Sequence, residues 1–389
     1  GAGPVPDPSP WTWQRSGDEW RISSGRLRLT VDSAGLFRSL VSVQAGAAGP
    51  GDTGPGEGSG REVFPPGKPG NLFQVFRDTP NQWDAWDLDA HYRYSSVDLR
   101  PDRMELEDGS GGRVLRITRS FGDSVAVQRI SLSPDGSAVD LDVDVDWHEQ
   151  QKLLKLAFPL DVHAAQATSE IQFGHIHRPT HANTSWDAAR FETVAHRWIH
   201  VGEPGYGVAV ANDSTYGHDT LRETLDGRTC TTVRLSLLRA PLFPDPGADQ
   251  GPHSFRFSLR PASEIPDAVA EGYRLNLPLR HVSGVSAEAP APILTVDNPA
   301  VVVEAVKLAE DRSGDVVVRL YEAHGGRAQA NVRAGFAYDD VAVTDLLERR
   351  IGSEAVGDGQ SPGGAVPLQL RPFELVTLRF RRSPGGRER

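Results

Sequence analysis

The clearest periodic pattern in the chain lies at residues 139–147, where apolar and acidic residues alternate strictly. The apolar positions are Val139, Leu141, Val143, Val145 and Trp147, and the acidic positions are Asp140, Asp142, Asp144 and Asp146. Because successive side chains of a strand point to opposite faces, this pattern predicts a strand with one buried face. We expect the acidic row to be a solvated face that blocks edge pairing rather than a metal site.

Shorter apolar or alternating runs, separated by Gly, Pro, Asp and Asn clusters, predict further strands. They cover residues 27–31, 114–117, 125–130, 171–175, 208–211, 233–238 and 255–259. Together they favour a large antiparallel sandwich. A helix is expected over 265–273, with Ser263 as its cap and with Asp267 and Glu271 on its exposed face.

The composition changes after residue 278, and the runs at 301–306, 316–320, 366–370 and 375–380 predict a second, small β-sandwich. We therefore divide the chain into a linker at 1–20, a large β domain at 21–275 and a small β-sandwich at 276–389. The stretches 44–60 and 352–364 are too polar and too Gly-rich to pack, and we expect them to be mobile loops.

Composition agrees with an all-β protein of more than one domain. The chain has 389 residues, too many for one ordinary core, and its 40 Gly and 29 Pro indicate many turns. A net charge of −11 and the lack of a basic run exclude nucleic acid and anionic membranes as expected partners. Cys230, the single cysteine, excludes an internal disulfide and favours the cytoplasm, with secretion left open.

No apolar run reaches the length of a membrane span, and the Gly/Pro-rich start lacks the features of a signal peptide. Because a start of this kind is typical of a linker, we expect the chain to be the second part of something longer.

Candidate chemistry is concentrated in two stretches. Residues 170–219 contain six of the twelve histidines and two of the eight tryptophans, and residues 81–89 read Asn-Gln-Trp-Asp-Ala-Trp-Asp-Leu-Asp. Planar polar side chains suit pairs of hydroxyl groups, and aromatic faces suit C–H surfaces. The two stretches therefore favour contact with a polyhydroxylated ligand.

Several motifs in order make the sequence recognisable. They are NLFQVFRD at 71–78, WDAWD at 83–87, FGHIHRPTH at 173–181, NTSWD at 183–187, ARFE at 189–192, HRW at 196–198 and LSLLRAP at 235–241, followed by KLAED at 307–311 and RLYE at 319–322. The series resembles the C-terminal β region of glycoside hydrolase family 38 α-mannosidases over nearly the whole chain. The resemblance implies a galactose-mutarotase-like supersandwich followed by the small β-sandwich.

The resemblance also implies what this chain lacks. Members of the family release terminal α-linked mannose with retention, using an Asp nucleophile that also binds zinc, in an N-terminal catalytic domain. No stretch here resembles those motifs, so we expect no catalytic residue, no metal ligand and no cofactor in this chain, and no activity from it alone. Its expected partners are that missing domain and an α-mannoside.

In this family the β region closes one side of the sugar site, so the resemblance makes the two dense stretches candidates for that face. The candidate residues are Trp83, Asp84, Trp86, Asp87, His175, Arg178, His181, Asn183, Trp186, Asp187, Arg190 and Glu192. Asp84 and Asp87 could accept sugar hydroxyls, and Trp83 or Trp86 could stack on a pyranose. Alternatively, residues 83–87 form an interdomain wedge with buried indoles and with carboxylates that cap backbone N–H groups.

His175 and His177 share a face of one expected strand, with His181 a turn beyond, so a metal site has to be considered. The spacing lacks a nearby acidic ligand. We favour a hydrogen-bonded network instead, which would fix the loop carrying Asn183 and Trp186; its expected members are His175, Arg178, Asp187, Arg190 and Glu192.

A second functional class remains open, a free-standing carbohydrate-binding or mutarotase-like protein. Mutarotation needs a paired acid and base, for which His175 and Glu192 are the candidates. If the first class is right, the loops bearing Trp83, Trp86, Trp186 and Trp198 have lost a partner surface, and we expect the chain to self-associate.

Overall fold

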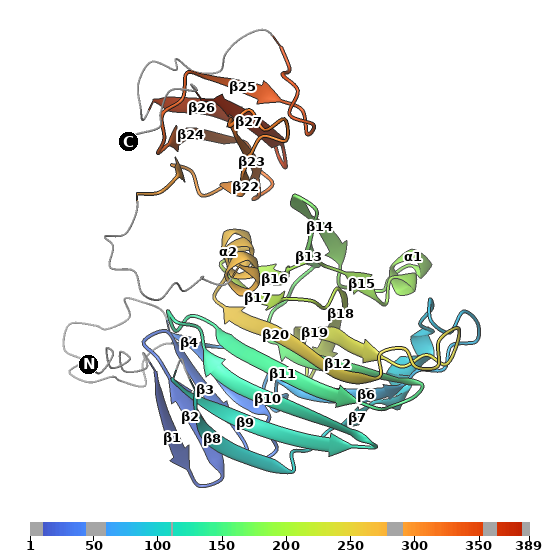
Figure 1. The fold of residues 1–389 in the computed structure, drawn as a ribbon. Coiled ribbons are helices and arrows are strands. Elements are labelled where there is room, and N and C mark those ends of the chain that lie inside the picture. The colour runs from blue at the N-terminus through green and yellow to red at the C-terminus, as the bar shows by residue number, and fades with distance from the viewer. Residues whose placement is uncertain (1–10, 44–59, 110–111, 278–290, 353–363, 383–389) are drawn as a thin grey trace, which may run out of the picture. The chain divides into compact units, whose positions relative to one another are not determined.

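The computed structural model describes residues 11–43, 60–109, 112–277, 291–352 and 364–382. The chain divides into two compact units, Gly1–Glu170 with His177–Pro278, and Ile171–Ile176 with Leu279–Arg389. Strands dominate both units, which confirms the all-β fold class (Figure 1). The boundary drawn from the sequence between the large and the small β domain stays a prediction.

Three antiparallel sheets hold the strands that begin before residue 262. The first is ordered β1 (Thr12–Ser16), β2 (Glu19–Ser23), β3 (Leu27–Val31), β4 (Phe37–Val43), β5 (Gly60–Glu62). The second is ordered β14 (Gly174–Pro179), β13 (Gln166–Ile171), β16 (Trp198–Glu203), β17 (Tyr206–Asn212), β20 (Gly251–Pro261), β11 (Val139–Trp147), β10 (Ser124–Leu132), β9 (Gly112–Phe121), β8 (Arg103–Gly109). The third is ordered β15 (Thr193–Val194), β18 (Gly217–Leu225), β19 (Arg228–Arg239), β12 (Lys152–Leu160), β6 (Leu72–Arg77), β7 (Val97–Asp98).

The inward faces of these sheets share one apolar core. Leu141 on β11, Leu156 on β12 and Leu235 on β19 are all at most 1% exposed and belong to the same cluster. Alternation along each strand is what lets one face enter this core while the other stays polar. The predicted strand at 139–147 is therefore confirmed, residue for residue.

The acidic row of β11 has a different role from the one expected. β11 is an internal strand, paired with β10 on one side and β20 on the other, so the expectation that the row blocks edge pairing is wrong. Asp144 is 2.6 Å from Arg129 of β10, and Asp140 is 2.5 Å from Arg274. Neighbouring strands and a helix supply arginines, and the row is stabilised by ion pairs.

The expected helix is α2 (Ile265–Asn276), but two details of its prediction are wrong. Glu264, not Ser263, is the N-cap, and it forms a capping box with Asp267. Glu271 is 1% exposed rather than solvated, because that face of α2 packs on the sheet and its carboxylate accepts the hydroxyl of Ser258 on β20. Two further short helices were not predicted, η1 (Ala90–Ser95) and α1 (Ser185–Ala189).

Two other segments also differ from expectation. The linker predicted at 1–20 is wrong for residues 11–20, since β1 and the start of β2 lie there and Trp11 is buried. The strand predicted over 171–175 is a hairpin turn, in which β13 ends at Ile171, Phe173 has φ 55° and β14 begins at Gly174. A turn of that shape requires the left-handed backbone region, which a strand pattern cannot reveal.

The second unit contains a small sandwich of two sheets. One sheet is ordered β21 (Leu294–Val296), β24 (Ala328–Ala334), β26 (Ala365–Leu370), and the other β22 (Val301–Leu308), β23 (Val316–Glu322), β27 (Leu375–Arg381), β25 (Asp340–Thr344). Val318, Val332, Val366 and Leu378 are fully buried between them. All four predicted strands are present, whereas β21, β24 and β25 were missed. The expected loops at 44–60 and 352–364 lie outside the described residues except at their ends.

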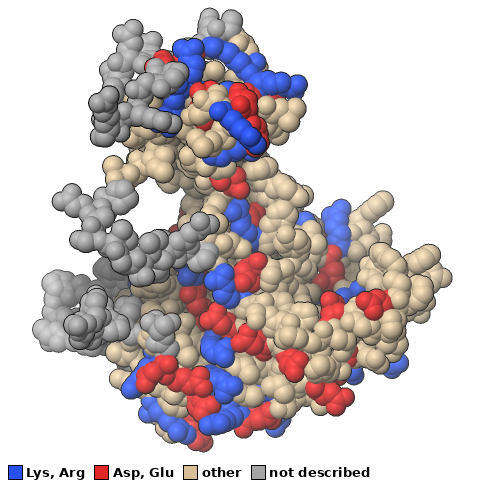
Figure 2. All heavy atoms as spheres, in the orientation of Figure 1, with Lys and Arg blue, Asp and Glu red and all other residues tan. Residues whose placement is uncertain are grey.

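Charges of both signs are interspersed on the surface shown in Figure 2, without a single basic field over the large unit. Within the described ranges, no helix is long and apolar enough to cross a membrane.

Candidate functional site

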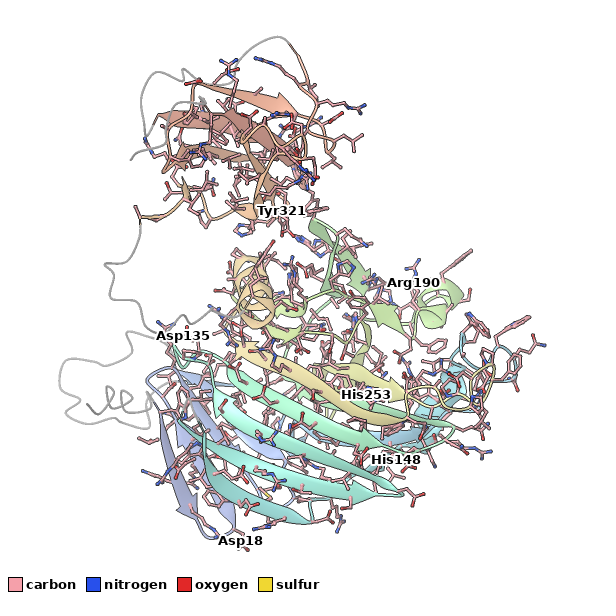
Figure 3. The ribbon with its side chains drawn as sticks, viewed as in Figure 1. Asp18, Asp135, His148, Arg190, His253 and Tyr321 are labelled. Atoms are coloured by element: carbon pink, nitrogen blue, oxygen red, sulfur yellow. The ribbon has the colours of Figure 1, made fainter. Side chains whose placement is uncertain are left out.

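One end of the six-stranded sheet carries the first dense motif of the sequence. There β6 leads into the loop 78–89 and η1, while β19 leads into the loop 240–250 and then β20. These segments surround a pocket of about 520 Å³, within the range of small-molecule sites (Figure 3, where His253 of its wall is labelled). It is lined by Leu88, Leu153, Glu192, Thr193, Val194, Gly217, Ser236, Leu237, Leu238, Arg239, Asp249, His253 and Phe255.

Arg239 anchors the loop 78–89. Its Nε donates to the Asp78 carboxylate at 2.6 Å, and its Nη2 donates to the backbone carbonyls of Asp84 and Asp87 at 3.0 and 2.8 Å. Burial raises the pKa of Asp78, although the hydrogen bond from Arg239 opposes that rise. One guanidinium therefore fixes the loop at three points, which a Lys could not do.

The backbone of the loop is closed on itself. The N–H groups of Trp86 and Asp87 both donate to the carbonyl of Trp83, at 2.8 and 2.9 Å, and Trp83 has a φ of 58°. A bulky residue in the left-handed region is strained, at a cost of order 1–3 kcal/mol. Such a conformation persists only when the surroundings impose it, and Arg239 does so here.

Asp84 joins this loop to the next one. Its carboxylate accepts hydrogen bonds from the backbone N–H groups of Leu242 and Phe243, at 2.6 and 3.0 Å. This is the backbone capping of the wedge interpretation, and it uses Oδ2 of the carboxylate that was a candidate for a sugar hydroxyl. The Asp87 carboxylate is exposed and makes no hydrogen bond or ion pair within the part of the chain that the structure describes.

The two joined loops present large apolar side chains to solvent. Trp83, Trp86, Leu242 and Phe243 are 65%, 66%, 37% and 67% exposed, and we call these four residues the aromatic tip. Their indoles are not buried in this chain. A rigid loop that exposes several large apolar groups is typical of a surface that meets another molecule.

Behind the pocket lies a buried ion cluster centred on Lys155 of β12, which is fully buried. Its Nζ donates to Asp219 of β18 at 2.6 Å, to the hydroxyl of Tyr92 at 3.0 Å and to Glu192. Asp219 also accepts from Arg234 of β19 at 2.7 Å. We call these five residues the Lys155 cluster.

The charges in the cluster hold one another ionised. Burial alone would lower the pKa of Lys155, but the carboxylates of Asp219 and Glu192 raise it above its ordinary value. Burial likewise opposes ionisation of Asp219, and Lys155 and Arg234 hold its pKa below the usual range. Burial raises the pKa of Tyr92 to about 12, so its hydroxyl stays a donor. A buried charge is tolerated only when it is paired in this way.

Glu192 connects the cluster to the pocket. One of its oxygens accepts from Lys155 and from the hydroxyl of Tyr92, and the other accepts from Ser236 at 3.1 Å. Because the carboxylate is held by three donors, it is not available as the base that was paired with His175 in the mutarotase alternative. That pairing is wrong.

The second dense motif spreads over separate places. Arg178, Asp187 and Arg190 line a space of about 20 Å³ near α1 (Figure 3, Arg190). Thr184 caps α1 by accepting from the Asp187 N–H at 3.1 Å, and Arg190 is 4.0 Å from Asp187. Trp186 on α1 is 77% exposed.

The histidines of this motif are divided between a second pocket and the second unit. His181 lines a second pocket together with His177, and its Nδ1 is 3.6 Å from Asp187 and 3.4 Å from the backbone N of the exposed Asn183. His175 is buried, belongs to the second unit and packs edge-on against Phe373 with ring centroids 4.8 Å apart.

Within the expected network of His175, Arg178, Asp187, Arg190 and Glu192, Asp187 and Arg190 lie 4.0 Å apart. Glu192 is instead held by Lys155, and Arg178 donates to the carbonyl of Val194, so the network is not formed as predicted.

Trp198 was expected on an exposed loop and is 1% exposed, on β16, the third strand of the nine-stranded sheet, which packs against α2. A Cβ on Gly272 of α2 would lie 2.8 Å from the Trp198 ring, so helix and indole are in close contact. Trp198 therefore cannot belong to a surface left by a missing partner.

Sequence reasoning assigned no role to Lys155, Asp219, Arg239 or Asp78. A signal for Lys155 was present, since it is the lone charge inside the apolar run LLKLAFPL at 153–160, and a charge in such a run needs a buried partner. Nothing local in the sequence identifies Asp219 as that partner.

A zinc ion, which the resemblance implies for the family, does not fit the residues present. Throughout the described ranges, no three His, Cys, Asp or Glu side chains gather closely enough to hold a metal ion. His175, His177 and His181 are not brought together in such a group.

Comparisons with known proteins agree over most of the chain. A family model described as the glycosyl hydrolases family 38 C-terminal domain matches residues 56–247, and one described as the family 38 C-terminal beta sandwich domain matches residues 300–378. The chain is 36% identical over 371 residues to alpha-mannosidase 2C1 of Homo sapiens, covering 92% of this chain and 33% of that protein. It is 31% identical to alpha-mannosidase G of Dictyostelium discoideum, covering 92% and 32%.

Among solved structures, the chain is similar to an alpha-mannosidase from Enterococcus faecalis V583 with a TM-score of 0.67 and 14% sequence identity, covering 93% of this chain and 42% of that one. At that identity the likeness concerns the fold. The chain spans about a third of the length of the curated relatives that it matches.

Proposed function

The chain belongs to glycosyl hydrolase family 38 as its C-terminal β region, and we propose that it serves there as the accessory part of an α-mannosidase that hydrolyses terminal α-linked mannose. The relatives that support this proposal carry the name alpha-mannosidase and are about three times as long. The chemistry is assigned to a catalytic domain that precedes the β region, and no catalytic residue is assigned to this chain.

The proposed reaction proceeds with retention and depends on zinc. A retaining glycosidase needs a carboxylate nucleophile and a second acid and base group close to one sugar. When bound, zinc would orient the sugar and stabilise developing charge. The residues that the structure describes do not fit such a metal site, so both the ion and the nucleophile are proposed to belong to the catalytic domain.

The proposed task of this chain is to present the aromatic tip and the 520 Å³ pocket to that domain, closing one side of the sugar site. The observation that carries this proposal is the contrast between exposure and rigidity in the tip. Trp83 and Trp86 are about two-thirds exposed, yet the loop beneath them is fixed by Arg239 and Asp84. Pre-ordered apolar groups lose little entropy when a partner covers them.

Within this arrangement, the Asp87 carboxylate is the group of the tip loop proposed to bind a sugar hydroxyl, since both of its oxygens are open. Asp84 has a positioning role, since it holds Leu242 and Phe243. Glu192 and Ser236 lie at the pocket wall, where the Lys155 cluster fixes their orientation.

The direct test is hydrolysis of a chromogenic α-mannoside. The purified chain should not release product above the uncatalysed rate, with or without added zinc, whereas a polypeptide carrying the chain behind a family 38 catalytic domain should turn over. Turnover by the chain alone would overturn the proposed division of labour.

A further inference from the structure

A second and larger pocket lies apart from the candidate functional site. It has a volume of about 690 Å³ and shares no lining residue with the 520 Å³ pocket. Its walls come from β13, β14, β16, β17 and the segment that enters α2. His181, a candidate residue from the family resemblance, lines this pocket, but the proposed function assigns the pocket no role. We call it the His200 pocket.

His200 of β16 is built into one wall. Its neighbours Ile199 and Val201 enter the apolar core, so His200 points to the opposite face of the sheet. His200 is nevertheless buried, with 8% of its surface exposed. Gly202 and Gly207, which pair across β16 and β17, make room for the ring. A Cβ on Gly207 would lie 2.3 Å from His200 Nε2, and one on Gly202 would lie 2.7 Å from Cε1.

The hydrogen bond of His200 fixes its tautomer. Nε2 lies 2.9 Å from the backbone carbonyl of Ser263, and because a carbonyl oxygen can only accept, Nε2 carries the proton. Burial lowers the pKa of His200, although the Ser263 carbonyl opposes that change. The ring is therefore neutral near pH 7, and Nδ1 is an acceptor. The described part of the chain gives the ring no other hydrogen bond.

The remaining walls also offer acceptors and C–H surfaces. Glu203 accepts from Arg61 at 2.6 Å through Oε1 and from the backbone N–H of His163 at 2.6 Å through Oε2, which leaves a further lone pair on each oxygen. The amide of Gln166 is exposed on the rim without a partner among the described residues. Pro179, Pro204, Ile265 and Pro266 supply apolar faces. No Lys or Arg lines the pocket, while Glu203 and Glu264 do.

This chemistry selects a class of ligand. Neutral O–H groups can donate to a fixed imidazole nitrogen and to carboxylate oxygens, and a ring with C–H faces can pack on proline. Two carboxylates line the walls, of which that of Glu203 is paired with Arg61, and no Lys or Arg lines them, so the walls disfavour an anion. A metal ion does not fit, because no cluster of three ligands is found in the described ranges. We propose that the His200 pocket binds a neutral pyranose sugar, with His200 Nδ1 accepting one of its hydroxyl groups.

The proposal concerns this chain alone and does not depend on the proposed mannosidase role. Binding of methyl α-mannoside, methyl α-glucoside and glucuronate to the purified chain can be followed by saturation-transfer NMR. We expect the two neutral pyranosides to bind with dissociation constants on the order of millimolar and glucuronate to bind more weakly. Absence of binding by the neutral sugars, or equal binding of glucuronate, would overturn the proposal.

Variants of His200 then locate the site. His200→Phe fills the same space without an acceptor and should weaken binding by about fivefold, the effect of one hydrogen bond, whereas His200→Gln keeps a donor and an acceptor and should bind like the wild type. His148→Phe is the control, since His148 is exposed on another part of the large unit (Figure 3). Unchanged binding by a folded His200→Phe chain would contradict the assignment.

If His200→Phe lowers the melting temperature so far that the chain is unfolded, Gln166→Ala at the exposed rim replaces it. That variant should fold normally and still weaken binding at least twofold. Wild-type affinity in folded Gln166→Ala would equally overturn the proposal. Hydrolysis of α-mannosides by a longer polypeptide would be unaffected by either outcome, so failure here and failure of the proposed function are distinguishable.

Discussion

The aromatic tip and the Lys155 cluster lie at the same end of one β-sheet, but they differ in which groups are buried and which are exposed. In the cluster, charges are buried, and every charged group has a partner of opposite sign: Lys155 with Asp219 and Glu192, and Arg234 with Asp219. In the tip, apolar rings are exposed, and the polar groups beneath them are used to fix the backbone. The cluster is arranged for stability, and the tip is arranged for contact with another molecule.

This difference teaches that residue type alone does not identify a binding residue. Asp84 and Glu192 were both candidates for sugar contact because they are carboxylates in dense polar motifs. Asp84 caps two backbone N–H groups, and Glu192 neutralises a buried lysine. In the loop 78–89, Trp83, Trp86 and Asp87 are the candidates whose side chains are exposed.

The largest effect should follow from breaking the cluster. Lys155→Met leaves Asp219 and Glu192 buried without their cation, and we expect the free energy of unfolding to fall by about 3–5 kcal/mol. Lys152→Met, on the same strand and only half-buried, is the matched control and should cost less than about 1 kcal/mol. Urea denaturation measures both. Equal losses in the two variants would mean that the cluster is not the stabilising element described.

The second largest effect on the free energy of unfolding is expected from acid, which acts on His218 of β18, beside the Lys155 cluster. Burial lowers the pKa of His218 to about 4, whereas an unfolded histidine titrates near 6.5. Between these values the unfolded chain binds more protons, so the stabilisation is complete above pH 6.5 and is lost as the pH falls to about 4, by up to about 3 kcal/mol. The groups facing the ring are Ser169, Thr193, Arg178, Asp219 and Lys155.

Unfolding free energies of the wild type and of His218→Asn, measured from pH 7 to pH 4, isolate this contribution. The variant should lose less stability over that range. Parallel pH profiles would show that His218 is not held neutral in the folded chain.

Loosening the tip should have a smaller effect. Arg239→Lys can still pair with Asp78 but cannot hold the carbonyls of Asp84 and Asp87, so we expect a loss of about 1–3 kcal/mol and faster hydrogen exchange at residues 83–87. Arg228→Lys, at the other end of β19 and paired with Asp161 on the surface, should change stability by less than about 1 kcal/mol. Unchanged exchange in Arg239→Lys would remove the argument for a rigid loop.

The smallest effect on stability is expected from the tip itself. Trp83→Ala with Trp86→Ala should alter the free energy of unfolding by no more than about 0.5 kcal/mol, because the rings are exposed. The same change should abolish self-association of the isolated chain, which we expect to strengthen as salt screens the net charge of −11. Sedimentation at low and high salt tests this. A wild-type chain that stays monomeric at every salt concentration would argue against an unpartnered surface.

The strands with alternation could be predicted from sequence, and the parts that depend on distant partners could not. β11 and β3 were located because their periodicity is local. The role of the acidic row was wrong because the position of β11 inside a sheet depends on β20, more than 100 residues away in sequence. Glu271 was placed on the exposed face of α2 because the sequence of the helix does not show that its partner, Ser258, lies on β20 beneath it.

The candidate site also contains features that the sequence located and features that it did not. The motif at 81–89 was found from its composition, and its capping alternative anticipated the role of Asp84. The anchor Arg239 could not be assigned, since it is 152 residues from Asp87, whose carbonyl it holds. Glu192 and His175 were grouped by closeness in sequence, but His175 packs against Phe373 in the second unit, whereas Glu192 is held by Lys155 in the first.

The most direct test of the central claim compares the tip in two contexts. Hydroxyl-radical footprinting reports the accessibility of Trp83 and Trp86 in the isolated chain and in a polypeptide that carries the chain behind a family 38 catalytic domain, with buried Trp147 and Trp198 as the unreactive baseline. If the tip closes against that domain, oxidation of Trp83 and Trp86 should fall several-fold in the longer polypeptide. Equal oxidation in both contexts would contradict the account.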